Sequence, residues 1–190
     1  MRKKMAHKQD SKREGGEDGN IGMSNSFLEQ IGYKLNSSYF EGVFSCDHLK
    51  LFKFAKNNKQ ARSVGVVNLM PSHIKNGHFA TWVIDREKNK LFVFDSLLLT
   101  NRDPVVLHFL EKVLEYYKGM KLVYPQVKYQ KENSEGCGLF ALAFVASQSK
   151  CCYKSLSRFL AMYDAKKKEK NEQISLKYIL SHIENCTNVK

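Results

Sequence analysis

The feature that most constrains this chain is a polar segment, residues 130–135, that ends in Gly136-Cys137-Gly138 and leads into an almost wholly apolar run, residues 139–146. The run is rich in Ala and Leu and contains neither Gly nor Pro, so it predicts a buried helix. Cys137 then lies at the helix N-terminus, where unpaired N–H groups and the helix dipole favour a thiolate. The alternative is an inert core thiol, because cysteine is among the most buried residue types.

Length and composition indicate one folded domain. The chain has 190 residues, of which 43% are hydrophobic and 12% aromatic, enough for a core. We expect residues 1–24, which are polar and glycine-containing, to form a disordered basic leader, and residues 25–190 to form a single domain. The basic residues of the leader are interpreted either as a solvated tail or as a nuclear-entry or nucleic-acid contact.

Charge and cysteine content restrict the partners and the compartment. The net charge of +12 favours acidic partners, nucleic acid above all. No apolar run is long enough to span a membrane, and no apolar segment follows the basic N-terminus, so neither a membrane location nor secretion is expected. The five cysteines include no C-x-x-C pair, which predicts free thiols in a reducing compartment.

Strand patterns cluster between residues 63 and 130, with helical patterns before and after them. This order predicts an α+β fold: a central mixed, largely antiparallel β-sheet flanked by helices. The expected strands are 63–69, 79–85, 91–94 and one or two around Pro125, at 122–124 and 127–129. The expected helices begin at a Ser26–Glu29 capping box, at Ser45, at Asp103-Pro104, at Cys137, near Leu156, and before a last amphipathic helix whose apolar side is Ile174, Leu176, Ile179, Leu180 and Ile183.

Two polar residues flank neighbouring strands of this predicted sheet. His78 precedes the strand 79–85, and Asp95 follows the strand 91–94. The short polar turn between the strands predicts an antiparallel hairpin, in which the start of one strand lies beside the end of the other. His78 and Asp95 are therefore expected to be neighbours at one rim of the sheet.

Together with Cys137 these residues have the composition of a cysteine-peptidase site. A thiolate attacks a carbonyl, a histidine moves the proton, and a carboxylate orients the imidazole. Gln130, seven residues before Cys137, can return through a folded loop and donate an amide N–H to the oxyanion beside the Cys137 N–H. Gly136 is expected to let residues 131–135 arch so that both donors face one oxygen.

Each residue also has an ordinary structural interpretation. His78 fits a surface histidine, Asp95 a turn former that caps Ser96, and Gln130 an exposed polar residue. The order His, Asp, Gln, Cys, with a hairpin joining the first two, is explained more simply by one catalytic site than by four coincidences.

The remaining histidines and cysteines are weaker candidates. No histidine pair has the i, i+4 spacing with a carboxylate that indicates a metal, so no metal site is predicted. Cys151 and Cys152 are adjacent, which is poor geometry for a disulfide between them, and they are interpreted as buried or semi-exposed thiols. The weaker histidines are His48, His73, His108 and His182.

At these motifs the sequence resembles the Ulp1-like cysteine peptidases, and within them the adenovirus protease (adenain) branch. The resemblance rests on Gly77-His78, on residues 93–96, and on Gln130 with Glu135-Gly136-Cys137-Gly138-Leu139-Phe140. The seven-residue offset from Gln130 to Cys137, with Asn133-Ser134 between them, is that of the adenain branch, as are residues 39–44 and Val67-Asn68. The resemblance implies a papain-like catalytic arrangement.

The resemblance implies a catalytic role for each of four residues. Cys137 is the nucleophile, His78 the general base, Asp95 the orienting acid and Gln130 the oxyanion donor. The family usually has Trp after the histidine, where this chain has Phe79, and the Trp of this chain, Trp82, lies three residues further on. A weaker aromatic stack on the imidazole is therefore expected.

The resemblance also implies partners and a location. Adenain-like enzymes cut viral precursor proteins at glycine-containing sites, often on DNA, which places this chain in a nucleus or a virion. An activating peptide and DNA are the cofactors implied. Residues 119–129 contain no cysteine, so activation through a disulfide-linked peptide is not supported.

Three functions follow as hypotheses from the sequence. The first is a thiol endopeptidase that matures structural proteins of a DNA virus or a virus-like element. The second is an isopeptidase that removes ubiquitin or a ubiquitin-like protein after a Gly-Gly end. The third is a DNA-binding module that kept the fold and lost catalysis, against which the complete Cys, His, Asp and Gln set argues.

Overall fold

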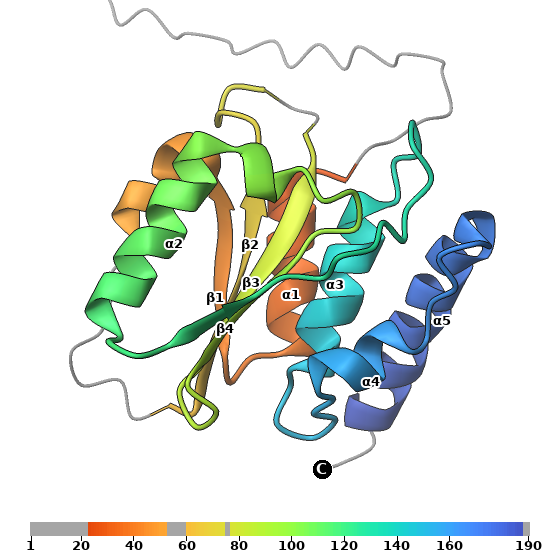
Figure 1. Cartoon of the computed structure of the whole chain (residues 1–190). Helices are drawn as coiled ribbons and strands as arrows, with labels where there is room; N and C mark the ends of the chain where they lie inside the picture. Colours follow the sequence, from red (N-terminus) through yellow and green to blue (C-terminus); the bar gives the residue numbers. More distant parts are fainter. Residues whose placement is uncertain (1–22, 53–59, 75–76, 188–190) are drawn as a thin grey trace, which may run out of the picture.

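A five-stranded mixed sheet with helices on both faces forms the molecule (Figure 1). This computed structural model describes residues 23–52, 60–74 and 77–187. One face of the sheet is covered by α1 and α3, with α4 and α5 outside them, and the other by α2 and the short helix η1. The expected leader, residues 1–24, lies almost wholly outside the described residues.

Strands and helices are interspersed along the chain up to β5, after which the only elements of the described residues are helices. The strands are β1 (Phe40–Ser45), β2 (Arg62–Asn68), β3 (Phe79–Asp85), β4 (Lys90–Phe94) and β5 (Lys121–Val123). The helices are α1 (Asn25–Leu35), η1 (Cys46–Leu51), η2 (Thr100–Arg102), α2 (Pro104–Tyr116), α3 (Cys137–Ser147), α4 (Leu156–Leu160) and α5 (Lys168–Thr187). No described helix is long and apolar enough to cross a membrane.

The strand order β1-β2-β3-β4-β5 follows the chain. The central strands β2, β3 and β4 are antiparallel, and the edge strands β1 and β5 lie parallel to their neighbours. The β3–β4 hairpin predicted from the sequence is confirmed, with Thr81 paired to Phe94 and Asp85 to Lys90. This register carries the start of β3 and the end of β4 to the same rim of the sheet.

Two hydrophobic cores lie on the two faces of the sheet. The first surrounds α3, whose residues are buried on all sides except at Leu139, as expected for a helix that is apolar all round. The second lies beneath α2, where Trp82 packs edge-on against Phe52 and tilted against Phe109. Burial of α3 on all sides fixes the position of its first residue, Cys137.

Several predicted helix ends are confirmed and others need correction. Asp103 caps α2 as predicted, accepting hydrogen bonds from the N–H groups of Val105 and Val106 at 2.9 and 3.0 Å. The cap of α1 is Ser24 and not Ser26, since the Ser24 hydroxyl accepts the Phe27 N–H. Ser45 precedes a 3₁₀-helix without capping it, because its hydroxyl accepts instead from Asn25 on α1.

Two further predictions are wrong in detail. Residues 127–129 are not a strand, and only β5 pairs with the sheet there. On α5, Leu176 and Leu180 are 44% and 51% exposed, so the predicted apolar side is too wide. Ile179 alone of that set is fully buried, since α5 packs on α3 along one narrow side.

Candidate active site

His78 and Asp95 are in direct contact at the rim of the β3–β4 hairpin. The Nε2 atom of His78 lies 2.6 Å from Oδ1 of Asp95, and the two side chains are 10% and 1% exposed. The backbone holds His78 in place, because its carbonyl accepts the N–H of Leu69 at 2.9 Å, which extends the β2–β3 pairing by one residue. The sequence prediction that the hairpin would bring the pair together is confirmed.

Asp95 is fixed by the turn that follows β4. Its Oδ1 accepts the Leu97 N–H and its Oδ2 the Thr100 N–H, both at 2.8 Å. Burial alone raises the pKa of this carboxyl, but the bonds and charge of His78 and the two N–H donors outweigh burial and lower it. Asp95 is therefore both a turn former and an ionised partner for the imidazole.

The imidazole of His78 interacts with Asp95 on one side and Cys137 on the other. Burial lowers the pKa of His78, but hydrogen bonds and charges from Asp95 and Cys137 outweigh burial and raise this pKa to about 9. Because Nε2 contacts Asp95, Nδ1 is the atom that remains for Cys137. The arrangement favours an imidazolium between two anions, as in a thiolate–imidazolium pair.

Cys137 is the first residue of α3, as predicted. Its Sγ lies 3.7 Å from the carbonyl oxygen of Gly77, the residue before His78. A side chain at position 77 would clash with buried Asn68, since a Cβ there would lie 1.9 Å from Oδ1 of Asn68. Gly77 therefore permits the close approach that places His78 beside the sulfur.

Gln130 is fully buried behind the Cys137 loop and is linked to the pair through Ser96. The Ser96 hydroxyl donates to Oε1 of Gln130 at 2.6 Å, and Nε2 of Gln130 donates to the Ser134 carbonyl at 2.7 Å. These bonds fix the orientation of the Gln130 amide. Its complete burial excludes the alternative that Gln130 is an exposed polar residue. The Ser96 contact was not anticipated, although an Asp-Ser pair directly after a strand is a signal that could have suggested it.

The loop between Gln130 and Cys137 arches for a reason different from the one expected. Gly136 has helical backbone angles, φ −70° and ψ −5°, so it supplies no unusual conformation. The left-handed residue is Asn133, at φ 64°. A Cβ at position 136 would lie 2.4 Å from the Glu172 side chain on α5, so a larger residue there would require that side chain to move.

Helix α5 supports the same loop from outside. Buried Asn171 donates through Nδ2 to the carbonyls of Tyr129 and Asp164, at 2.8 and 2.9 Å. The segment just before Gln130 is thereby tied to the start of α5. The start of α5 thus helps to hold the loop before Cys137 in place.

A cleft of about 340 Å³ opens over Cys137 and His78. Its walls are largely apolar, with polar groups from the loop before α3 at one side. The apolar walls come from Met23, Met70, Phe79, Leu97 and Leu99. A concave, mostly apolar cleft with a few polar groups is the usual form of a substrate-binding site.

Trp82 and the other histidines lie away from this cleft. Trp82 belongs to the core beneath α2, so the expected aromatic stack on His78 is not formed by it. His48 and His108 are exposed on η1 and α2, and His73 is exposed in the loop after β2. His182 is buried on α5.

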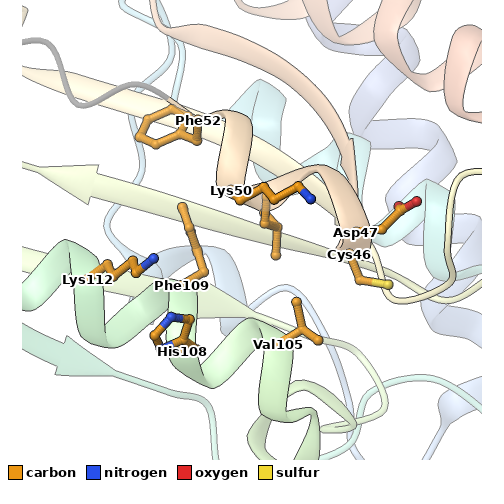
Figure 2. Close-up of a pocket in the computed structure, with 9 residues that line it drawn as sticks. Cys46, Asp47, Lys50, Phe52, Val105, His108, Phe109 and Lys112 are labelled. Atoms are coloured by element: carbon orange, nitrogen blue, oxygen red, sulfur yellow. The ribbon is translucent and has the colours of Figure 1, made fainter.

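A second hollow, of about 370 Å³, lies between η1 and α2 (Figure 2). Its interior is apolar, with Phe52 and Phe109, and Lys50 and Lys112 stand at its sides. Cys46 also lines it. Burial first, and then the charges of the nearby carboxylates Asp103 and Asp47, raise the pKa of this thiol. Since a protonated thiol is a poor nucleophile, we do not assign thiol chemistry to this hollow.

Comparison with known proteins agrees with the fold and the kind of site. Residues 53–177, about two thirds of the chain, match the family model for the Ulp1 protease family, C-terminal catalytic domain. A comparison with curated protein sequences finds no match.

Solved structures are similar at low sequence identity. The SUMO protease Ulp1, with its catalytic cysteine oxidised to a sulfenic acid, is 14% identical with a TM-score of 0.50, over 85% of this chain and 80% of that one. The Chlamydia trachomatis effector Cdu1, bound to ubiquitin, is 10% identical with a TM-score of 0.47, over 90% and 84%. The ASFV pS273R protease is 15% identical with a TM-score of 0.44, over 61% and 44%.

Proposed function

The chain belongs to the Ulp1 protease family, and on that premise we propose that it is a thiol endopeptidase using Cys137, His78, Asp95 and Gln130. One observation carries the proposal: the 2.6 Å contact between His78 and Asp95 at the N-terminus of α3, beside the Cys137 sulfur. A buried carboxylate, an imidazole and a thiol in that order are the three parts that nucleophilic acyl transfer requires.

In the proposed reaction the Cys137 thiolate attacks the carbonyl carbon of the scissile peptide bond. The carbonyl oxygen becomes an oxyanion, which the Cys137 N–H and the Gln130 amide stabilise. The imidazolium of His78 gives its proton to the leaving amine as the C–N bond breaks, which leaves a thioester on Cys137. Neutral His78 then takes a proton from water, the hydroxide attacks the thioester, and the acid leaves as the thiolate is restored.

Asp95 supports this cycle by stabilising and orienting the imidazole of His78. A carboxylate at Nε2 stabilises the imidazolium before the leaving amine is protonated and holds the ring so that Nδ1 faces the sulfur. The Leu97 and Thr100 N–H groups keep Asp95 ionised when it is buried. Asp95 thus acts by positioning and charge.

The substrate we propose is a viral or virus-like precursor protein cut at a glycine-containing site. The support is the adenain-type spacing of seven residues from Gln130 to Cys137, with Asn133-Ser134 between them. The left-handed backbone of Asn133 and the Ser134 carbonyl that accepts the Gln130 amide give that spacing a structural role. A nuclear or virion location belongs to the same proposal.

A second candidate is removal or processing of a ubiquitin-like protein. Membership of the Ulp1 protease family favours it, and the solved Ulp1 of the same fold is a SUMO protease. The same four residues would perform this reaction, so the site itself does not separate the two substrate classes.

Covalent probes separate the two candidates. SUMO and ubiquitin bearing C-terminal vinyl sulfones are incubated with the chain, in parallel with peptides that contain internal glycine pairs. The precursor-peptidase proposal expects peptide cleavage without labelling by either probe. Labelling of Cys137 by a ubiquitin-like probe alone would exclude it in favour of the second candidate, and Cys137→Ala is the control for both assays.

DNA is proposed as an electrostatic partner, supported by the net charge of +12. Because such binding releases counterions, affinity for duplex DNA should fall by about 10³-fold or more between 50 and 200 mM salt if six or more phosphates are contacted. Fluorescence anisotropy with a labelled duplex measures this slope. Affinity independent of salt would exclude the electrostatic contact.

A further inference from the structure

Three metal-ligating side chains meet at the end of α3 that lies away from Cys137. Cys151 and Cys152 occupy the turn after α3, and His182 lies on α5. One ligand atom from each falls within 4.8 Å of the other two. The chain passes through α4 between the two contributions, so the cluster is a product of the fold and is not visible as a spacing motif.

His182 is arranged as a metal-binding histidine usually is. It is 3% exposed, and its Nε2 lies 3.0 Å from the carbonyl oxygen of Leu35 at the end of α1. A carbonyl accepts only from a protonated nitrogen, so the neutral ring carries its proton on Nε2 and its lone pair on Nδ1. A backbone carbonyl that fixes the tautomer and the ring plane in this way is the common outer partner of histidine ligands.

The turn that carries the two thiols is anchored at Lys154, on its C-terminal side. The Lys154 N–H donates to the Ser147 carbonyl at 2.8 Å, and Nε2 of buried Gln148 donates to the Lys154 carbonyl at 3.1 Å. These bonds hold the turn against the last residues of α3 and fix where the cysteines emerge. The carbonyl end of a helix is also the end that favours a cation.

The cluster is accessible from solvent. A cavity of about 350 Å³ opens over Cys151, Cys152 and His182, and Cys151 is exposed. A hydrated ion can therefore reach ligands that are otherwise held on buried elements. An entry path is one of the conditions that a real metal site has to meet.

We propose that Cys151, Cys152 and His182 bind a zinc ion. Two thiolates and one imidazole nitrogen are the ligand types that zinc prefers, and the set balances its two positive charges. Tetrahedral zinc with Zn–S bonds of about 2.3 Å places two sulfurs about 3.8 Å apart, so ligand atoms within 4.8 Å need only a small contraction. Binding converts two thiols into thiolates and releases their protons to solvent.

The fourth position of the ion is assigned to water. Cys186 follows His182 by four residues on α5, but its side chain lies outside the described part of the structure and is not included in the site. The bound ion would join the turn after α3 to α5 and, through Leu35, to the end of α1. Because Cys137 is at the other end of α3 (Figure 1), the ion stabilises the helical layer and takes no part in the acyl transfer.

Spectroscopic titration with cobalt and zinc tests the site. The parent protein is the full chain carrying Cys137→Ala, so that the Cys137–His78 pair offers no competing metal site, and it is reduced and stripped with a chelator. We expect one Co²⁺ per chain, with a thiolate-to-cobalt charge-transfer band and visible bands of tetrahedral cobalt, both displaced by Zn²⁺. Zinc should also raise the melting temperature of this parent.

Variants in the same background decide whether these three residues are the ligands. Cys151→Ser, at an exposed position, should lower the zinc affinity at least about 100-fold and remove the zinc-dependent rise in melting temperature. Cys46→Ser is the matched control and should bind as the parent does. Absence of cobalt binding by the parent would overturn the proposal, and so would binding that survives both Cys151→Ser and His182→Ala.

Discussion

Cys46 and Cys137 are almost a matched pair, and the difference between them shows what activates a thiol in this fold. Each is the first residue of a helix, η1 and α3, and they are 9% and 8% exposed. Burial and a helix N-terminus are thus common to both. What differs is the neighbour: His78 beside Cys137, and the carboxylates Asp47 and Asp103 near Cys46.

The charge of the neighbour outweighs the shared features. An imidazolium beside a sulfur favours the thiolate, whereas nearby carboxylates favour the neutral thiol. The pKa of Cys46 is raised, first by burial and then by the charges of Asp103 and Asp47. A hollow of similar size also lies over Cys46 (Figure 2), so a hollow beside a thiol is not what distinguishes the two sites. Reactivity follows from the hairpin that delivers His78 and Asp95.

Removal of the Cys137 sulfur should nearly abolish catalysis, whereas removal of the Cys46 sulfur should leave it almost unchanged. Cys137→Ala is expected to lower kcat/KM for a cleavable glycine-containing peptide by about 10⁴-fold or more, because no nucleophile remains. Cys46→Ala should retain kcat/KM within about twofold. Equal losses in the two variants, with far-UV circular dichroism unchanged, would show that the thiols are not functionally distinct.

Asp95 is the next largest expected effect. Asp95→Asn keeps the volume but removes the charge at Nε2 of His78, and we expect kcat to fall by about 10²- to 10⁴-fold with a smaller change in KM. The pH dependence of kcat/KM should also change, since the imidazolium loses its anionic partner. Asp103→Asn, near Cys46, is the matched control, because it also removes a carboxylate that accepts backbone N–H groups. If Asp103→Asn lowered kcat as much as Asp95→Asn does, the role assigned to Asp95 would be contradicted.

Gln130 should matter less than the charged pair. Gln130→Ala removes one oxyanion donor and is expected to lower kcat by about 10²- to 10³-fold. Ser96→Ala frees the amide oxygen of Gln130 but leaves its N–H groups, so its loss should be smaller. A Gln130→Ala enzyme with normal kcat and reduced melting temperature would assign Gln130 a structural role only.

The smallest effect is on stability, and its sign follows from the raised pKa of His78. The folded value is about 9 and the ordinary value is 6.5, so the protonated ring stabilises the fold fully below pH 6.5 and this contribution disappears as pH rises through 9. Denaturant unfolding of the wild type and of His78→Gln should therefore differ more at pH 6 than at pH 9.5, by about 1–3 kcal/mol. A difference that grows with pH would contradict the charge assignment.

Much of the site was predictable because it depends on local patterns. The β-rich apolar stretches 79–85 and 91–94, with a short polar turn between them, predict a hairpin, and a hairpin places His78 next to Asp95. Asp103-Pro104 gave the start of α2, since an aspartate cap and a proline at the first helical position act through neighbouring residues. The family resemblance then assigned the order of the roles.

The parts that were missed depend on contacts distant in sequence. The Glu172 side chain lies against Gly136, Ser45 bonds Asn25 and does not cap η1, and Trp82 faces α2 because of its place in β3. The Cys151, Cys152 and His182 cluster is invisible to a search for i, i+4 spacing, because its members meet only after α5 packs on α3. Local patterns do not carry that information.

The central claim, that His78 activates Cys137, is tested most directly by the rates at which iodoacetamide alkylates Cys137 and Cys46 at pH 7. Mass spectrometry of the folded protein gives both rates in one sample, and the near-equal exposure of the two residues makes each the control for the other. The account predicts that Cys137 reacts at least about tenfold faster than Cys46, and that His78→Ala removes the advantage. Equal rates in the wild type, or an advantage that survives His78→Ala, would contradict it.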